Sequence, residues 1–231
     1  MDKSSLVACT FDCYGTLIDW EGGVGSFLYD RALQERDDDA LNGRVLRERW
    51  ETIQFEVIQG RYRPYREVLG ESLGRLAAER GWRYDEEEDG KAFARAMRSW
   101  QPFPDTAPAL RRAHESGLRL VIVTNTDRDI IEHSLRHIEA PIDDVIAAED
   151  VGSYKPAPGH FKRALELIAP DGPAQILHIA FGFKYDIGPA QEHGMSSAWV
   201  NRHDEQRPGP AVPDLEWRDL WGLAELRAGG R

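Results

Sequence analysis

The sequence predicts an α/β protein in which a doubly wound parallel sheet carries an inserted all-helical cap. Short apolar runs, several of them rich in β-branched residues, recur along the chain, and helical patterns separate the later runs. Strands that alternate with helices are typical of a parallel sheet covered by helices on both faces. The alternation stops after the first run, where the chain is helical in character up to its return to the sheet. We therefore expect a core of residues 1–19 and 104–231 and a helical cap of residues 20–103.

Five apolar runs are the expected strands of this core. The expected strands are Leu6–Phe11, Leu118–Thr124, Val145–Ala147, Ile176–Phe181 and Ser197–Val200. The expected helices between them are Ala107–Ser116, Arg128–Ile138, Pro158–Ile168 and Ile187–His193. The segment after Asn201 contains three prolines, so we expect a loop that ends in a short helix near Leu220–Arg227.

An apolar stripe predicts the first well-defined helix of the cap, because its members follow one another at spacings of four, three and four residues. The stripe consists of Leu46, Trp50, Ile53 and Val57. Two further helical patterns cover about Tyr65–Arg80 and Glu86–Trp100. Pro102 and Pro104 then mark the return of the chain to the core.

Composition excludes several classes of function. A formal net charge of -11 over 231 residues argues against a nucleic-acid partner, since phosphate neutralisation requires clustered Lys and Arg. The first residues are polar and no apolar run reaches the length of a membrane span, so we expect neither a signal peptide nor a membrane contact. The two cysteines are interpreted as small buried thiols of a reducing compartment. We expect a cytoplasmic protein.

Polar side chains follow four of the expected strands. In open α/β sheets, ligands bind where the carboxyl ends of the strands meet. The four loops at those ends are Asp12–Asp19, Thr124–Asp127, Asp150–Pro156 and Phe181–Asp186. We expect the polar side chains of these loops to converge at one edge of the sheet and to form the functional site.

The first two loops offer a nucleophile and hydrogen-bond donors. A carboxylate at a strand end, such as Asp12, can attack an electrophilic carbon or phosphorus and form an ester or an acyl phosphate. Gly15 permits a close backbone approach, and the Thr16 hydroxyl can hold the carboxylate. Thr124 and Asn125 can bind a carboxylate or phosphoryl oxygen of the substrate, or else they cap the helix that follows.

The four loops resemble the four motifs of the haloacid dehalogenase (HAD) superfamily, in order and with similar spacing. The resemblance covers essentially the whole chain and includes a helical cap after the first motif. Within the superfamily, Asp12–Leu17 (Asp-Cys-Tyr-Gly-Thr-Leu) resembles the L-2-haloacid dehalogenase (type II) subfamily. The resemblance implies a Rossmann-like core of the HAD type and a hydrolase that forms a covalent aspartyl ester.

The resemblance also implies roles for individual residues. Asp12 is the nucleophile, Lys155 pairs with it and holds its charge, and Asp186 orients the lysine or helps to activate the hydrolytic water. We expect Asp12, Thr16, Lys155 and Asp186 to be the catalytic residues. Relatives are often homodimers, so a homodimer is the expected assembly.

Tyr14 favours attack at carbon over hydrolysis of a phosphate ester. Phosphatases of the superfamily carry a second aspartate at this position, which protonates the leaving alkoxide. A phenol is a poor acid near neutral pH, because its reference pKa is about 10. The departure of a halide requires no proton, so Tyr14 is expected to line the substrate pocket. We expect no cofactor, and Mg²⁺ only if the protein is a phosphatase.

Further residues are expected to contact the substrate or to close the pocket. The resemblance implies a cap arginine that receives the leaving halide. Arg47 and Arg49 are both in range, and Arg47 is taken as the candidate, with a surface ion pair with Glu51 as the alternative for it. The fourth loop has aromatic residues and a lysine where known dehalogenases carry Ser, Asn and Trp. The substrate contacts that we expect from the cap and this loop are Trp20, Phe183, Lys184 and Tyr185. Trp50 and Tyr62 are further candidates to close the pocket.

Three functions are compatible with these residues. The first is SN2 attack of Asp12 at the alpha carbon of a small 2-substituted carboxylic acid, as in an (S)-2-haloacid dehalogenase, followed by hydrolysis of the ester. The second is ring opening of a strained cyclic amino acid such as azetidine-2-carboxylate, with Tyr14, Asp19 or Lys184 as the proton donor. The third is a Mg²⁺-dependent phosphatase that acts on small molecules.

Overall fold

A single six-stranded parallel sheet forms the centre of the protein. The computed structural model describes residues 1–40 and 42–226 of the 231-residue chain. Its sheet has the strand order β3-β2-β1-β4-β5-β6, and all neighbouring strands are parallel. The strands are β1 (Ala8–Phe11), β2 (Arg119–Thr124), β3 (Asp144–Ala147), β4 (Ile176–Ala180), β5 (Ser196–Val200) and β6 (Leu215–Trp217). The predicted α/β class is confirmed, and the five expected strands are present.

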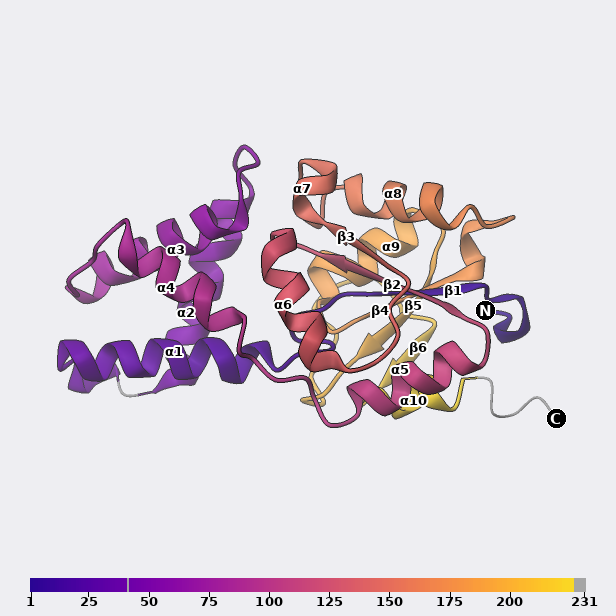
Figure 1. Cartoon of the computed structure of the whole chain (residues 1–231), viewed down its shortest axis with the longest axis horizontal. Coiled ribbons are helices and arrows are strands. Elements are labelled where there is room, and N and C mark those ends of the chain that lie inside the picture. The colour runs from indigo at the N-terminus through magenta and orange to yellow at the C-terminus, as the bar shows by residue number, and fades with distance from the viewer. Residues whose placement is uncertain (41, 227–231) are drawn as a thin grey trace.

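Helices cover both faces of this sheet (Figure 1). Successive residues of a strand point to opposite faces, so Val121 packs in one apolar cluster with α8 and α9, whereas Leu120 packs in another with α5, α6 and α10. These helices are α5 (Thr106–Glu115), α6 (Arg128–Ile138), α8 (Gly159–Ile168), α9 (Gly188–Glu192) and α10 (Trp221–Ala224), and a short α7 (Ala148–Val151) follows β3. This arrangement is the expected doubly wound core.

The last third of the chain differs from the prediction in two places. The prediction of a continuous loop after Asn201 was wrong at Leu215–Trp217, which forms β6. This strand has only three residues and is only partly buried, so it lacks the apolar pattern of a core strand, and pairing with β5 defines it. The closing helix α10 ends at Ala224, and Arg227 of the expected helix lies outside the described residues.

Four helices between β1 and β2 form the cap, and they pack on one another at one end of the core (Figure 1). They are α1 (Trp20–Glu35), α2 (Gly43–Ile58), α3 (Tyr65–Arg80) and α4 (Glu88–Met97). The predicted apolar stripe lies on α2, and all of its side chains are buried. α3 has the predicted bounds. None of the helices in the described part of the chain is long and apolar enough to cross a membrane.

The two chain segments that connect core and cap run side by side. The backbone N–H of Asp19 donates to the carbonyl of Gln101 at 3.0 Å, and the N–H of Phe103 donates to the carbonyl of Leu17 at 3.0 Å. The Asp19 carboxylate caps α1 by accepting from the N–H of Gly22 at 2.9 Å. Both crossings come directly after the loop that contains Asp12, so the cap is fixed next to the end of β1.

Candidate active site

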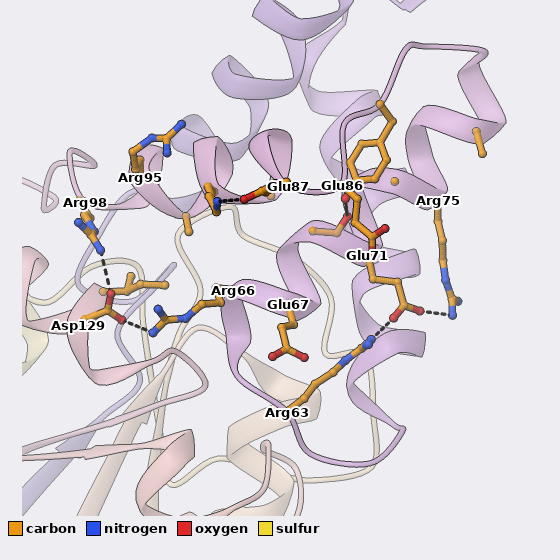
Figure 2. A pocket seen from close by; sticks show the side chains of 18 residues that line it. Arg63, Arg66, Glu67, Glu71, Arg75, Glu86, Glu87, Arg95, Arg98 and Asp129 are labelled. Carbon is orange, nitrogen blue, oxygen red and sulfur yellow. Dashed lines mark hydrogen bonds and ion pairs between the residues drawn. The ribbon is translucent and has the colours of Figure 1, made fainter.

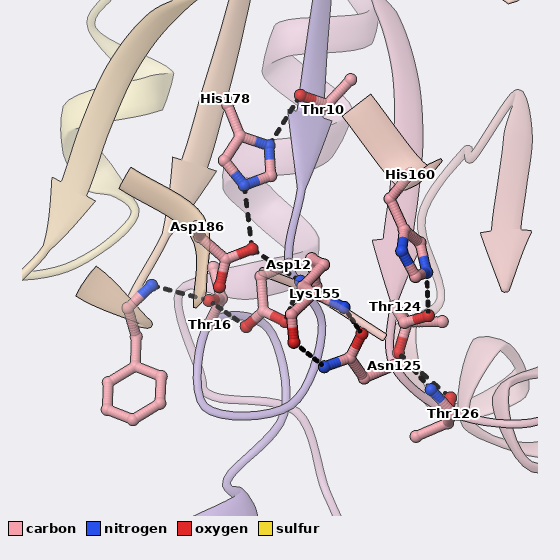
Figure 3. Close-up of polar contacts among 11 residues, drawn as sticks. Thr10, Asp12, Thr16, Thr124, Asn125, Thr126, Lys155, His160, His178 and Asp186 are labelled. Atoms are coloured by element: carbon pink, nitrogen blue, oxygen red, sulfur yellow. Dashed lines mark hydrogen bonds and ion pairs between the residues drawn. The ribbon is translucent and has the colours of Figure 1, made fainter. Parts of the chain in front are cut away.

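The site lies where the carboxyl ends of β1, β2 and β4 meet, because these three strands are neighbours in the sheet (Figure 3). Asp12 directly follows β1, and Thr124 is the last residue of β2. Asp186 belongs to a π-helical turn, Phe183–Ile187, that follows β4. Lys155 comes from the loop between α7 and α8. Parallel pairing thus brings together side chains that lie far apart in the sequence.

Lys155 lies between two carboxylates in the interior of the protein. Its Nζ is 2.9 Å from Oδ1 of Asp12 and 2.6 Å from Oδ1 of Asp186. The side chain of Lys155 is 1% exposed and that of Asp186 is 2% exposed, whereas Asp12 reaches 12%. A buried charge is tolerated only when it is paired and hydrogen-bonded, which is the case for all three groups. Asp12 is the most accessible of them and is therefore the one that a substrate can reach.

Sharing one ammonium group between two carboxylates perturbs all three pKa values. Burial raises the pKa of Asp12 above its ordinary value, Lys155 opposes this shift, and the charge of Asp186 adds to it. Burial acts against the charged form of Asp186 as well, but Lys155 and His178 outweigh it and lower its pKa. Burial disfavours the ammonium of Lys155, yet the two carboxylates raise its pKa. Lys155 therefore stays charged, and Asp12 is the more basic of the two carboxylates.

The Thr16 hydroxyl fixes the second oxygen of Asp12. It donates to Oδ2 of Asp12 at 2.7 Å and accepts from the backbone N–H of Phe181 at 2.9 Å, so it joins the first loop to the fourth. Gly15 makes this turn possible, because it has a φ of +100° and a Cβ there would lie 2.5 Å from the Phe181 ring. With Lys155 on one oxygen and Thr16 on the other, the carboxylate is held in a single orientation.

Asn125 clamps the backbone that carries Lys155. Its Oδ1 accepts from the N–H of Lys155 at 2.6 Å, and its Nδ2 donates to the carbonyl of the same residue at 3.1 Å. Thr124 lies beside it, and its hydroxyl is 3.0 Å from the Thr126 hydroxyl. The helix that follows has Asp127 at its N-cap position, so Thr124 and Asn125 do not cap it. The side chain of Asn125 positions Lys155 and at the same time lines the cavity described below.

Two buried histidines, His160 and His178, support the site, and neither was expected from the sequence. His178 lies 3.1 Å from Asp186 through Nε2 and 2.8 Å from the Thr10 hydroxyl through Nδ1 (Figure 3). His160 has its pKa lowered to about 4 by burial and by Lys155, so it is neutral, and its Nε2 lies 3.0 Å from the carbonyl oxygen of Thr124. The contact between Thr10 and His178 has a signal in the sequence, which is one polar residue in each of two apolar strands. The two residues are paired with each other in the register of β1 and β4.

A cavity of about 80 Å³ adjoins Asp12 between core and cap. The core contributes Asp12, Tyr14, Thr124, Asn125, Thr126, Lys155, Phe181, Gly182, Tyr185 and Asp186 to its walls. The cap contributes Trp20, Glu51, Gln54, Tyr65 and Met97. Sites for drug-sized ligands measure roughly 300 Å³ or more, so this cavity suits a substrate of few atoms. The four cap residues other than Trp20 were not expected in this wall from the sequence, because their position depends on how the cap docks onto the core.

A larger groove of about 940 Å³ runs along α3 and α4 of the cap and reaches Asp129 of α6, and Asp12 is not among its described lining residues (Figure 2). Many of its charged side chains pair with one another. Asp129 binds Arg66 and Arg98, and Glu71 binds Arg63 and Arg75. The groove is thus a surface of internal ion pairs, and the smaller cavity is the one that contains chemically reactive groups.

Tyr14 lines the cavity and is held by its own hydrogen bond. Its hydroxyl is 2.7 Å from the Ser134 hydroxyl of α6, and its ring meets Trp100 edge-on at 6.2 Å between centroids. Burial raises the pKa of Tyr14 well above its ordinary value. The phenol therefore stays protonated and forms a wall of the cavity.

Two expected substrate contacts of the fourth loop lie outside the cavity. The Phe183 ring packs against Trp199, with 5.2 Å between the ring centroids. The Nζ of Lys184 lies over the ring of Phe55, 3.7 Å from its centroid, and the residue is exposed. Tyr185, between Lys184 and Asp186, does line the cavity. In a π-helical turn successive side chains point in different directions, and this decides which of the three can reach a substrate.

The cap residues that we expected near the substrate also divide into two groups. Trp20 lines the cavity, whereas Arg47, Trp50 and Tyr62 are not among the described residues of its wall. The guanidinium of Arg47 lies over the Trp20 ring, 5.8 Å from its centroid, and its Nη1 is 2.6 Å from Glu21. Trp50 packs against Trp20 from within the cap, at 6.2 Å between centroids. The guanidinium of Arg47 thus forms ion pairs within the cap.

The oxygen ligands at this site do not fit a divalent cation. Mg²⁺ requires several oxygen ligands in octahedral geometry. The site offers the carboxylates of Asp12 and Asp186, and the ammonium of Lys155 already binds one oxygen of each. Within residues 1–40 and 42–226, no group of three or more His, Cys, Asp or Glu side chains could hold a metal ion.

Comparisons with known proteins agree with the fold. The family model for haloacid dehalogenase-like hydrolases matches residues 6–194. (S)-2-haloacid dehalogenase H-109 of Pseudomonas putida is 27% identical over 221 residues, which cover 93% of this chain and 95% of the relative.

Solved structures show the same fold. The L-2-haloacid dehalogenase RSc1362 aligns with a TM-score of 0.83 at 24% identity, over 97% of this chain and 99% of the other. An L-2-haloacid dehalogenase from Xanthobacter autotrophicus, with chloropropionic acid covalently bound, aligns with a TM-score of 0.80 at 23% identity, over 98% of this chain and all of the other (100%). A family model that spans most of the chain, on a sheet and cap of this topology, places the protein among the haloacid dehalogenase-like hydrolases.

Proposed function

We propose that this hydrolase attacks the alpha carbon of a small 2-substituted carboxylic acid with the carboxylate of Asp12. Attack by an Asp12 oxygen breaks the bond between that carbon and the leaving group, which departs with the electron pair, and leaves an aspartyl ester. Water then hydrolyses the ester and releases a 2-hydroxy acid. The observation that carries this proposal is the Asp12 carboxylate, fixed by Lys155 and Thr16 at the wall of a cavity of about 80 Å³.

The surrounding residues have distinct tasks in this scheme. Lys155 keeps Asp12 ionised before attack, and Thr16 aligns the attacking carboxylate. Asp186 holds Lys155 through Oδ1, and because its carboxylate also lines the cavity it is placed to hold the hydrolytic water. Thr124, Thr126 and the backbone around them face the carboxylate of the substrate.

A halide is the first candidate for the leaving group. A halide departs without a proton. Hydrolysis of a phosphate ester would need an acid that protonates the leaving alkoxide. The Tyr14 hydroxyl, which is buried and bound to Ser134, is a poor acid for that step. The dehalogenase relatives, among them the one solved with chloropropionic acid covalently bound, support attack at carbon.

Oxygen labelling tests the covalent step. We expect that one turnover of excess enzyme on (S)-2-chloropropionate in heavy-oxygen water places the label in the Asp12 carboxylate, since water attacks the ester at the aspartyl carbonyl. Peptide mass spectrometry locates the label, and further turnovers carry it into the product. Label in the product of the first turnover, with none in Asp12, excludes the covalent ester. Robust hydrolysis of an aryl phosphate that EDTA abolishes would favour the phosphatase alternative.

The pH profile should reflect the raised pKa of Asp12. The carboxylate is the nucleophile, so the rate falls as the pH drops through that pKa, and a raised pKa moves the fall to higher pH. We expect the acidic limb of kcat/KM to have its midpoint above 3.8, the ordinary value for an aspartate. Rates measured with 2-chloropropionate check this, with circular dichroism to show that the protein stays folded. A midpoint at or below 3.8 in folded protein contradicts the expectation.

A further inference from the structure

His178 is a polar side chain in the interior of the sheet. It lies on β4 and is fully buried (0% exposed), and its ring meets the Phe161 ring edge-on, with 5.4 Å between the centroids. It is not among the described residues that line the cavity, so a bound substrate does not touch it. A buried imidazole is tolerated when its nitrogens have hydrogen-bond partners. The partners of the two ring nitrogens therefore determine what this side chain contributes.

The two contacts of His178 assign the hydrogen of its ring (Figure 3). Nε2 is 3.1 Å from Oδ1 of Asp186, and Nδ1 is 2.8 Å from the Thr10 hydroxyl. A carboxylate only accepts hydrogen bonds, so Nε2 carries a hydrogen and donates it to Asp186. In the neutral ring Nδ1 is then an acceptor, and the Thr10 hydroxyl donates to it. Thr10 thus holds the ring in the orientation and tautomer that serve Asp186.

Both hydrogen bonds to the Asp186 side chain end on the same oxygen. Nζ of Lys155 is 2.6 Å from Oδ1, the oxygen that His178 also binds. Oδ2 has no hydrogen-bond donor within residues 1–40 and 42–226. It lies beside Gly182, where a Cβ would be 2.5 Å away, and Gly182 and Asp186 both line the cavity. Oδ2 is therefore the oxygen of Asp186 that stays available to a water molecule.

Lys155 alone cannot maintain this arrangement after the first chemical step. In the resting enzyme the ammonium is held between the carboxylates of Asp12 and Asp186. Once Asp12 is an ester it has lost its charge, and the ammonium can pair with either oxygen of Asp186 as that carboxylate turns about its Cβ–Cγ bond. His178 contacts Asp186 and Thr10 and does not contact Asp12, so its bond to Oδ1 is the same in both states.

We infer that His178 is a positioning residue for hydrolysis of the ester: it holds Asp186 so that Oδ2 can take a proton from the attacking water. The inference rests on the proposed Asp12 ester and assigns a task in its second step to a residue outside the cavity. Because His178 acts through Asp186, it should matter little for the first step, the attack of Asp12 on the substrate.

The proton balance of this step involves Asp186 and leaves His178 unchanged. The water oxygen bonds to the carbonyl carbon of the Asp12 ester while one water proton passes to Oδ2 of Asp186. The tetrahedral intermediate then breaks its bond to the alkoxide of the 2-hydroxy acid, which takes that proton from Asp186. Asp12 is left as a carboxylic acid and releases the second water proton to solvent. His178 keeps its own hydrogen on Nε2 throughout.

Two amide substitutions separate the two contacts of His178. The amide nitrogen of Gln reaches the place of Nε2, so His178→Gln keeps a donor for Asp186 and gives up the bond with Thr10. The shorter His178→Asn ends near Nδ1, so it keeps a partner for Thr10 and gives up the donor for Asp186. A side chain that merely filled space would not favour Gln over Asn in the second step alone.

Quenched single-turnover kinetics on (S)-2-chloropropionate measure both steps, and mass spectrometry of the Asp12 peptide follows the ester. We expect His178→Asn to hydrolyse the ester at least about tenfold more slowly than the wild type, with ester formation within about threefold, so that the ester accumulates. His178→Gln should hydrolyse it within about threefold of the wild type. Hydrolysis by His178→Asn at the wild-type rate, or equal slowing of both steps, would overturn the inference.

Thr10→Val is a milder variant that keeps the test informative if His178→Asn does not fold, as judged by thermal unfolding. It removes the hydroxyl that holds the ring and should slow hydrolysis by about threefold without slowing ester formation. An unchanged hydrolysis rate in this variant counts against the inference.

The resting enzyme offers a measurement that needs no turnover. Nitrogen-15 NMR of the wild type, with His178→Gln to assign the signals, should show the His178 hydrogen on Nε2. A hydrogen on Nδ1 alone contradicts the inference, whatever the chemistry of Asp12. Failure of the ester mechanism would instead appear as absence of the Asp12 ester in every variant, so the two failures are distinguishable.

Discussion

The Asp12→Asn variant should be inactive, with kcat lower by about 10⁴-fold or more, while its fold is unchanged. The amide has nearly the shape of the carboxylate but is a far poorer nucleophile. Its oxygen can still accept from Lys155, and the Thr16 hydroxyl can rotate to accept from its NH₂ group. Loss of one of two buried carboxylates also relieves their repulsion, so we expect the stability of the variant to equal or exceed that of the wild type.

Single-turnover kinetics with 2-chloropropionate and thermal unfolding check this result. Asp30→Asn is a suitable control, because Asp30 is an exposed carboxylate on α1 and its replacement should not affect the rate. Intact-protein mass spectrometry must show that the amide has not deamidated back to Asp12. More than about a tenth of the wild-type rate in amide-intact protein would refute the nucleophile assignment.

The Lys155→Met variant should lose about 10³-fold or more in kcat at neutral pH. Methionine fills a similar volume but leaves Asp12 and Asp186 facing each other without a cation. Lys155 opposes the rise in the pKa of Asp12, so its removal raises that pKa further and favours the protonated acid, which cannot attack. The buried pair then shares a proton instead of an ammonium group.

The pH dependence of this variant separates an electrostatic role of Lys155 from a merely structural one. A higher pKa of Asp12 moves the acidic limb to higher pH, so the residual rate of Lys155→Met should keep rising with pH where the wild-type rate is already constant. Lys155→Arg provides a comparison that keeps the charge. A rate within tenfold of the wild type at neutral pH, or an acidic limb at lower pH than that of the wild type, would contradict the assignment.

Local patterns in the sequence were sufficient for most of the fold. The apolar runs and the helix stripe containing Trp50 depend on residues a few positions apart, and hydrophobic burial acts on such neighbours directly. The position of Asp12 and Asp186 after two strands, and of Lys155 in the loop after a third, followed from the rule that the carboxyl ends of parallel strands meet. The structure brings these three side chains within hydrogen-bonding distance, as expected from that rule.

Long-range contacts decided the remainder. The pairing of Thr10 with His178 depends on the register between β1 and β4, and β6 exists only through its pairing with β5. Glu51 could be interpreted from the sequence only as the ion-pair partner of Arg47, because nothing within one helix turn shows which face of α2 meets the core. Docking of the cap onto the sheet places Glu51 at the cavity, whereas Arg47 lies over the Trp20 ring and is not among the described residues of the cavity wall. The sequence by itself therefore determined which loops hold the reactive groups, since strand ends are local features. Tertiary packing determined which side chains of the cap face them, since that depends on the relative position of two surfaces far apart in the chain.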